Sequence, residues 1–147
     1  ETVVAEGMNE VVLLGQTVNS YHDGEFDFAD LLRAVGRVDG VRRIRFTSPY
    51  PNDFTDRVIA AMAEVDAVCE HVHLPMQSGS SRVLKRMLRR YNREGYLESV
   101  AKLRAGIPGL SLTTDVIVGF PGETDADFEE TLEVIREVGF AEAFALI

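Results

Sequence analysis

Residues 112–128 run from a strand through a glycine-rich turn into a helix, and this order constrains the fold more than any other feature of the chain. Residues 112–118 form a mostly apolar, β-branched run of strand length. The Gly-Phe-Pro-Gly sequence at 119–122 cannot continue either a strand or a helix. Thr124 then occupies an N-cap position, with Asp127 three residues later as in a capping box.

The same order of strand, loop and helix occurs three times before this segment. Strand-length runs at residues 11–14, 41–46 and 71–74 are each followed by a polar loop and a helical pattern, and a strand-like run ends the chain at 140–147. Strands linked by helices of this length must run parallel, with right-handed crossovers. Mostly apolar strands fit a sheet with helices on its outer face. The sequence therefore predicts an α/β fold, which is a barrel, a partial barrel or a doubly wound sheet.

The predicted helices carry apolar residues at helical spacing. Asp27 and Asn92 are the predicted N-caps of two of them, and Thr55 or Asp53 begins a third. The residues expected to face the core are Phe28, Leu31, Leu32 and Val35; Phe54, Val58, Ile59 and Met62; Val83, Leu84, Met87 and Leu88; Leu97, Val100, Ala101 and Leu103; and Phe128, Leu132, Ile135 and Val138.

Charge and composition narrow the class of partner. The chain has 147 residues, which suits one compact domain, and a formal charge of −9 from 15 basic and 24 acidic residues. This balance argues against nonspecific nucleic-acid binding by the whole surface, and we expect no DNA partner. Six basic residues nevertheless gather at 82–93, where a local stripe can meet a phosphate or a carboxylate. No apolar run approaches the length that crosses a bilayer, so we expect a cytoplasmic protein without a membrane partner.

Four polar loops follow the four predicted strands, and in a parallel sheet their positions coincide at one end, where such folds bind ligands. Glycines there let backbone groups approach a ligand closely, and amide and hydroxyl side chains suit a ribose, an adenine edge or an amino-acid zwitterion. In any one loop, glycine and proline are better explained as turn formers, but four such loops at one rim favour a ligand site. The candidate residues in these loops are Gly15, Gln16, Asn19, Ser48, Gln77, Ser78 and Gly119.

Other chemical signals are weaker. The sequence contains neither G-x-x-x-x-G-K-[ST] nor G-x-G-x-x-G, the glycine-rich motifs that bind phosphate groups. Their absence disfavours a doubly wound dinucleotide-binding fold. His71 and His73 share a strand face, but two histidines alone are a weak metal signal. Asp115 lies in a mostly apolar strand, where we expect it to face the side that carries His73 or an arginine and to belong to a structural network at least as readily as to a catalytic one. Cys69 is interpreted as structural. No catalytic residue and no metal ligand is assigned.

Several motifs together resemble the radical S-adenosylmethionine methylthiotransferases, and the likeness covers essentially the whole chain. They are Gly-Gln-Thr-Val-Asn-Ser-Tyr at 15–21, Arg-Phe-Thr-Ser-Pro-Tyr-Pro at 45–51, His-Leu-Pro-Met-Gln-Ser-Gly-Ser at 73–80, Arg-Arg-Tyr-Asn-Arg-Glu at 89–94 and residues 115–128. The resemblance implies a partial (β/α) barrel of the radical SAM type, with parallel strands and helices on the outer face. Its greatest likeness is to members that add a methylthio group to isopentenyl-adenosine next to the tRNA anticodon. Members acting on threonylcarbamoyl-adenosine have nearly the same motifs and are the first alternative.

The resemblance also implies roles for the loops. Gly15 and Gln16 would contact the methionine end of S-adenosylmethionine, and Gln77 and Ser78 its ribose or carboxylate. Val118 and Gly119 would flank the adenine. Arg89 or Arg90 would meet the carboxylate. The implied chemistry is reductive cleavage of the cofactor by a four-iron four-sulfur cluster, followed by hydrogen abstraction from the substrate and sulfur insertion.

One departure from the family is large, because the three cluster-binding cysteines are absent. Residues 1–147 are therefore expected to be a fragment of the catalytic domain, without its cluster-binding start, the N-terminal domain and the C-terminal RNA-binding domain. Such a fragment is expected to be inactive alone, to meet tRNA only through the full-length parent, and to self-associate through its edge strands. Two other classes remain open, a non-radical α/β-barrel enzyme and a noncatalytic nucleotide-binding module; upstream cysteines would exclude both.

Overall fold

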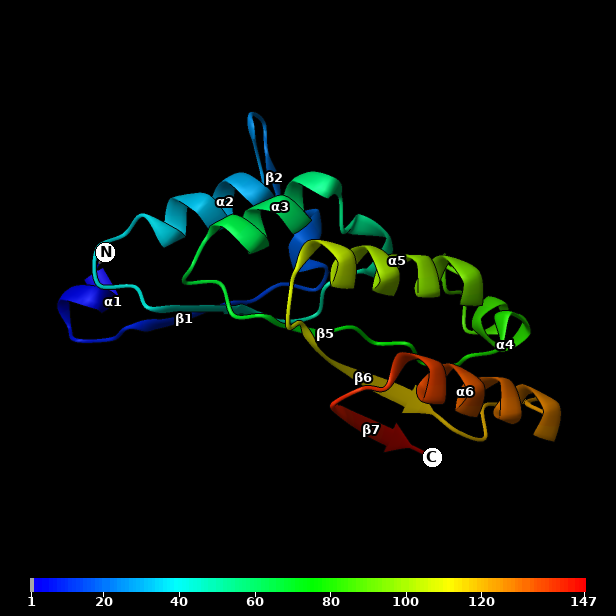
Figure 1. Cartoon of the computed structure of the whole chain (residues 1–147). Coiled ribbons are helices and arrows are strands. Elements are labelled where there is room, and N and C mark those ends of the chain that lie inside the picture. The colour runs from blue at the N-terminus through cyan, green and yellow to red at the C-terminus, as the bar shows by residue number, and fades with distance from the viewer. Residues whose placement is uncertain (1) are drawn as a thin grey trace.

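The computed structural model describes residues 2–147, and it places helices along one side of a set of parallel strands (Figure 1). Strand β1 (Glu10–Leu13) pairs with β4 (Arg43–Phe46), and β6 (Ser111–Ile117) pairs with both β5 (His71–His73) and β7 (Glu142–Leu146), always in parallel. A bridge between Ile44 and Val68 joins β4 to the segment that precedes β5. The strands therefore follow one another in the order β1-β4-β5-β6-β7.

All five predicted strands are confirmed, and the fold is α/β with parallel strands. Within residues 2–147 the strands form an open arrangement that does not close into a barrel. A short antiparallel hairpin, β2 (His22–Asp23) with β3 (Phe26–Asp27), was not predicted. Gly24 at φ 58° turns this hairpin, and its strands are too short to show any alternation in the sequence.

Helices connect the strands as the sequence predicts. Their bounds are α1 (Thr2–Ala5), α2 (Phe28–Gly36), α3 (Asp56–Glu64), α4 (Ser81–Arg86), α5 (Arg93–Gly106) and α6 (Asp125–Val138), with 3₁₀ turns η1 (Val18–Ser20) and η2 (Pro51–Asp53). The predicted N-caps at Asp27, Thr55, Asn92 and Thr124 are confirmed, each side chain accepting a hydrogen bond from a backbone N–H of the first helical turn.

Asn92 offers a direct test of these caps, because its Oδ1 accepts from the Gly95 N–H at 2.9 Å. We expect Asn92→Ala to lower the free energy of unfolding by about 1 kcal/mol, since the first turn of α5 loses its cap. Asn92→Ser keeps an acceptor at the same place and should cost only a small part of that. Urea denaturation of the two variants measures the difference, and equal losses would contradict the capping role.

The core lies between the strands and the helices. Phe28, Leu32, Ile44, Leu84 and Leu103 are fully buried there. The ring of Phe28 meets that of Phe46 edge-on, with centroids 5.3 Å apart.

Three residues predicted to face the core do not. Leu88 is 87% exposed because α4 ends at Arg86, and Leu88 adopts a left-handed φ of 58° in the turn that follows. Ala101 and Phe128 are also exposed. On α6 the buried face is centred on Thr131, Val134 and Val138, because the hydroxyl of Thr131 anchors the loop after β5.

The length and composition of the helices decide whether any of them could cross a membrane. Over residues 2–147, none of them combines the length and the apolar composition that a bilayer crossing requires.

Candidate functional site

The loops that follow β1, β4, β5 and β6 leave the same end of the parallel strands, as predicted. Asn19 joins the first two of them. Its Nδ2 donates to the carbonyl of Tyr50 at 2.9 Å, and its Oδ1 accepts from the Tyr50 N–H at 2.7 Å. The amide of this buried side chain is thus used to hold two loops together.

The loop after β5 continues to pair with β6 beyond the end of the strand. The Gln77 N–H donates to the Asp115 carbonyl, and the Gln77 carbonyl accepts from the Ile117 N–H, both at 2.8 Å. Gln77 is buried, with 8% of its surface exposed, and its side chain has no hydrogen bond within the described chain. Gln77 also has a left-handed φ of 67°. Its backbone is therefore fixed, while its amide stays available at the strand end.

Ser78 and Gly79 anchor this loop to α6. The Gly79 N–H donates to Thr131 Oγ1 at 2.9 Å, and the hydroxyls of Ser78 and Thr131 lie 3.3 Å apart. A side chain at Gly79 has no room, because its Cβ would lie 2.5 Å from the Glu130 carbonyl oxygen and 2.6 Å from the Thr131 Cα. Glycine is needed here for close approach of two backbones.

A buried carboxylate fixes the loops after β5 and β6 to each other. Asp127 accepts hydrogen bonds from the Ser80 hydroxyl at 2.7 Å, from Arg82 Nε at 3.1 Å and from the Thr124 N–H at 2.8 Å. Arg82 also donates to the Gly122 carbonyl at 2.8 Å. We call these residues the Asp127 clamp.

The hydrogen bonds of the clamp set the ionisation of its carboxylate. The Arg82 guanidinium, followed by the Thr124 and Ser80 hydroxyls, holds the pKa of Asp127 far below its usual range. The side chain of Asp127 is 7% exposed. Sequence inspection identified Asp127 only as a capping-box residue; its tertiary partners are separated from it by more than 40 residues.

The other candidate residues are exposed around the rim. They are Gly15, Gln16, Ser48, Arg89, Arg90 and Gly119, and Val118 beside them is half-buried. A cavity of about 400 Å³ lies among Ser20, Tyr50, Arg89 and Arg90, and a neighbouring one of about 420 Å³ is lined by Gly15 and Gln16. The rim therefore offers hollows that contain members of the predicted set.

Three arginines of the basic segment are used within the fold. Arg82 belongs to the Asp127 clamp, Arg86 donates to the Pro121 carbonyl at 2.8 Å, and Arg93 pairs with Glu133 at 3.0 Å. In the described part of the chain Arg89 and Arg90 form no ion pair, so the guanidinium groups of these two remain available at the rim.

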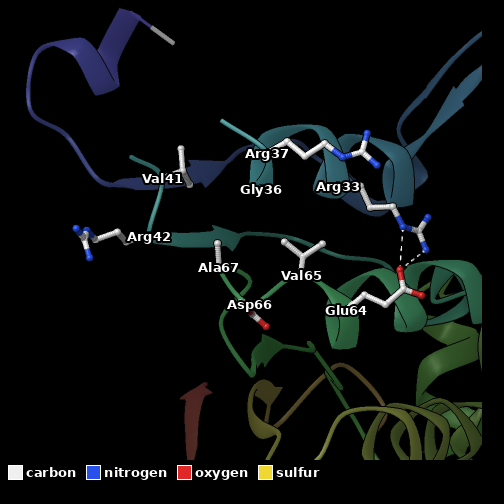
Figure 2. Close-up of a pocket in the computed structure, with 9 residues that line it drawn as sticks. All are labelled: Arg33, Gly36, Arg37, Val41, Arg42, Glu64, Val65, Asp66 and Ala67. Atoms are coloured by element: carbon white, nitrogen blue, oxygen red, sulfur yellow. Dashed lines mark hydrogen bonds and ion pairs between the residues drawn. The ribbon is translucent and has the colours of Figure 1, made fainter. Parts of the chain in front are cut away.

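A cavity of about 670 Å³ lies at the opposite end of the strands (Figure 2). It is lined by residues just before β4 and just after α3, and the Arg33–Glu64 ion pair at 3.0 Å bounds it. None of the predicted site residues lies there, so size alone does not identify the site.

A second polar group lies on the strand face that turns away from the helices, here called the helix-free face. His73 Nε2 is 3.2 Å from Asp115 Oδ2, and His73 Nδ1 is 2.9 Å from Thr113 Oγ1. Thr113 Oγ1 is also 3.3 Å from His71 Nε2. The predicted approach of Asp115 to His73 is confirmed. Burial, with the charge of Arg45, lowers the pKa of His71.

The side chains present can be compared with those that an iron–sulfur cluster and S-adenosylmethionine need for binding. Cys69 is the single cysteine and is half-buried, so the described residues do not fit a four-iron four-sulfur cluster. Nor do three histidine, cysteine or carboxylate side chains converge anywhere in residues 2–147. S-adenosylmethionine fits better: Gly119 has a left-handed φ of 76° with open space where a Cβ would stand, and Gln77 keeps an unused amide.

Several known proteins are similar to this chain in sequence. Residues 1–135 match the family described as the radical SAM superfamily. The chain is 57% identical over 98% of its length to the tRNA-2-methylthio-N(6)-dimethylallyladenosine synthase of Streptomyces viridosporus, covering 29% of that protein. The proteins of the same name from Acidothermus cellulolyticus and Clostridium perfringens are 56% and 53% identical, over 98% and 100% of this chain and 30% and 34% of theirs. The chain spans about a third of the length of these relatives. With its parallel α/β fold and its match over residues 1–135, the chain belongs to the radical SAM superfamily.

Proposed function

We propose that this chain is the cofactor-binding part of the catalytic domain of a tRNA methylthiotransferase that acts on N(6)-dimethylallyladenosine. The observation that carries the proposal is the identity of 53–57% over nearly the whole chain to synthases of that name. Within this proposal the open set of strands is part of a radical SAM-type partial barrel in a larger catalytic domain. The protein works in the cytoplasm, where tRNA is modified.

The rim residues are assigned to S-adenosylmethionine. Gly15 and Gln16 line one hollow, Gly119 leaves open space for a planar group, and Gln77 presents its amide between them in the strand order. Arg89 or Arg90 supplies the cation for the carboxylate. Ser48 and Gln77 both have a left-handed φ, and such strained positions cluster at ligand sites.

In this assignment the other predicted residues act differently. Asn19 and Ser78 use their polar groups to fix the loops, so in addition to their predicted place in the cofactor site they position its loops. Val118 donates its N–H to the Leu146 carbonyl at 2.8 Å, which holds the base of the Gly119 turn. S-adenosylmethionine, bound with a cluster held elsewhere in the parent, supplies the radical chemistry. The residues of this chain bind and orient it.

The cofactor assignment predicts a specific loss. In the full-length protein, Gln77→Leu should weaken binding of S-adenosylmethionine by roughly fivefold, since one hydrogen bond contributes about 1 kcal/mol. Asn9→Leu, an exposed position at the other end of β1, is the control and should leave binding unchanged. Equilibrium dialysis with the radiolabelled cofactor measures both. A Gln77 variant with wild-type affinity would remove Gln77 from the site.

Deletion of the gene tests the proposed substrate. In cells that lack the gene for the full-length protein, tRNA should contain no methylthio-dimethylallyladenosine and should accumulate dimethylallyladenosine. Mass spectrometry of the digested tRNA measures both nucleosides. Loss of the methylthio derivative of threonylcarbamoyl-adenosine would instead establish the alternative substrate. Unchanged tRNA nucleosides would contradict both.

The proposal extends to the edges of the sheet. In the described chain the outer sides of β1 and β7 pair with no further strand, and every residue of β7 is exposed. We expect residues 1–147 expressed alone to self-associate through these edges. Sedimentation of a monodisperse monomer at high concentration would contradict this.

A further inference from the structure

Three basic residues on the outer side of the rim form no ion pair in the described part of the chain. They are Lys85 in the last turn of α4, and Arg89 and Arg90 in the turn that follows. All three are exposed. The chain has a formal charge of −9, and most of its other basic side chains pair with a carboxylate. This local excess of positive charge favours an anionic partner from outside the described chain.

The three cations line a single hollow of about 590 Å³. It lies in the helix layer, between η2, α4 and the start of α5, at the same end of the strands as the rim (Figure 1). Its other lining residues are neutral, namely Asn52, Ser81, Tyr91, Asn92 and Gly95. Glu94 lies at its border, where the Ser81 hydroxyl donates to the carboxylate at 3.5 Å. With three cations against one acid at its border, the hollow suits an anion.

The turn after α4 is fixed by hydrogen bonds of its backbone. The Arg89 N–H donates to the Leu84 carbonyl at 2.9 Å, and the Arg90 carbonyl accepts from Asn52 Nδ2 at 3.3 Å. Asn52 belongs to η2, so the turn is tied to the loop after β4. The backbone from which both guanidinium groups extend therefore has a defined position, which reduces the conformational entropy that binding costs.

Tyr91 ties the same turn to the loop after β5. The side chain is buried, and its hydroxyl donates to the carbonyls of Pro75, at 3.1 Å, and Met76, at 3.3 Å. Burial raises the pKa of Tyr91 to about 12, so the hydroxyl stays a donor at neutral pH. Pro75 and Met76 directly precede Gln77, whose amide is assigned to S-adenosylmethionine. A ligand held by the basic turn is thereby positioned relative to the cofactor loop.

The cavity at the opposite end of the strands has a different charge. Arg37 and Arg42 line it and form no ion pair in the described part of the chain, but the carboxylates of Glu64 and Asp66 line it as well. Charges of both signs favour no single class of ion there. The hollow beside the rim is therefore the better anion site of the two.

We propose that the hollow at Lys85, Arg89 and Arg90 binds a backbone phosphate of the RNA substrate. Lys85 supplies a point charge, and an arginine supplies a planar guanidinium that bonds two phosphate oxygens. Both arginines also line the hollow beside Tyr50, so one of them serves the phosphate and the other serves the carboxylate of S-adenosylmethionine. The proposal rests on the proposed function, in which the reacting nucleotide must reach the end of the strands where the cofactor is bound.

Such a contact orients the RNA without reading its sequence. Phosphate contacts fix the register and the orientation of a nucleic acid, whereas contacts with the bases carry specificity. The contact is therefore independent of the group on N6 of the target adenosine. Substrates of either type of methylthiotransferase should use it alike.

The test uses the full-length protein and an anticodon stem-loop hairpin of RNA that carries N(6)-dimethylallyladenosine. Fluorescence anisotropy gives the dissociation constant of the hairpin at several salt concentrations, and equilibrium dialysis gives that of S-adenosylmethionine for the same preparation. Lys85→Gln removes the one cation of the hollow that is not assigned to the cofactor. Lys102→Gln is the matched control, because Lys102 is the other lysine of the chain and pairs with Asp56 at 3.7 Å on the exposed side of α5.

Lys85→Gln should weaken binding of the hairpin about fourfold at about 0.15 M salt, because one phosphate contact contributes roughly 0.7 to the slope of log affinity against log salt. The slope itself should fall by that amount. A hairpin with unmodified adenosine should lose affinity by the same factor, since the backbone is contacted. Binding of S-adenosylmethionine should not change, and the Lys102→Gln protein should bind both ligands like wild type.

Arg89→Gln and Arg90→Gln separate the two roles of the arginines. One variant should lower the salt slope as Lys85→Gln does, and the other should weaken binding of S-adenosylmethionine. If neither changes the slope, the phosphate site is overturned. A Lys85→Gln protein that loses affinity for the cofactor alone would assign the hollow to the cofactor instead. One that binds RNA like wild type but unfolds at a lower temperature would show that the parent's own chain covers the hollow, which also overturns the proposal.

Failure of the proposed function has a different signature. If the wild-type protein does not bind the hairpin, the function and the inference fail together. If it binds the hairpin and Lys85→Gln leaves the slope unchanged, only the inference fails. A lower slope in Lys85→Gln, with no methylthio product formed from bound tRNA by wild type, would retain the phosphate site and overturn the proposed reaction.

Discussion

Gly79→Ala should lower the free energy of unfolding by about 2–3 kcal/mol, which is among the largest effects expected of a single methyl group in this chain. The added Cβ would lie 2.5 Å from the Glu130 carbonyl oxygen and 2.6 Å from the Thr131 Cα. Both are backbone atoms of α6, so no side-chain rotation relieves the contact. The loop after β5 must move away from α6, and the 2.9 Å hydrogen bond from the Gly79 N–H to Thr131 is lost.

The displaced loop carries Gln77, so we expect weaker binding of S-adenosylmethionine by the same variant. Gly95→Ala is the matched control, because the nearest atom to its Cβ would be the end of the Asn92 side chain at 3.1 Å. Alanine is also the better helix former, so the change in stability there should be small. Chemical denaturation measures both variants. Equal stabilities of the Gly79→Ala and Gly95→Ala proteins would contradict the close approach of the loop to α6.

Asp127→Asn should release the two rim loops from each other. The neutral amide cannot accept all the hydrogen bonds that Ser80, Arg82 and Thr124 now donate to the carboxylate. The start of α6 and the loop after β5 are then held only by their remaining contacts. We expect a lower midpoint of thermal unfolding and faster amide exchange in residues 77–82 and 119–127. Asp125→Asn, at an exposed position two residues earlier, is the control.

The effect of Asp127→Asn should depend on pH with a defined sign. Hydrogen bonds from Arg82 above all, and then from Thr124 and Ser80, depress the pKa of Asp127 in the folded state from its ordinary value of 3.8. A depressed folded pKa stabilises the protein above the unfolded pKa, and this stabilisation is lost as pH falls toward the folded pKa. The gap in unfolding midpoint between wild type and variant should therefore be constant near neutrality and narrow below about pH 4. A gap that widens on acidification would contradict the clamp.

The strands and helix starts could be predicted because they depend on local signals. The strand-length runs at 11–14, 41–46 and 112–118, and caps such as Thr124, can be recognised from neighbouring residues alone. The faces of α4 and α6 could not be predicted fully. Leu88 follows the helical spacing, but the helix ends before it, and the buried position of Thr131 depends on a loop more than 50 residues away.

The candidate rim could also be predicted, since parallel strands bring their following loops to one end. The sequence could not predict which rim residues keep their side chains free for a ligand and which use them to fix the loops. Asn19, Gln77 and Ser78 all look like ligand-binding polar residues in the sequence, yet only Gln77 keeps its side chain free of partners in the described chain. The Asp127 clamp and the contact of Phe144 with His73 arise from tertiary packing between distant residues, so they cannot be predicted from local sequence patterns.

The most direct test of the central claim uses the full-length protein, reconstituted anaerobically with iron and sulfide. It is incubated with a reductant, with S-adenosylmethionine deuterated in its methyl group, and with tRNA that carries N(6)-dimethylallyladenosine. Mass spectrometry of the digested nucleosides should show methylthio-dimethylallyladenosine with the deuterated methyl group. A sample with an intact cluster that cleaves the cofactor but leaves dimethylallyladenosine unmodified would contradict the account.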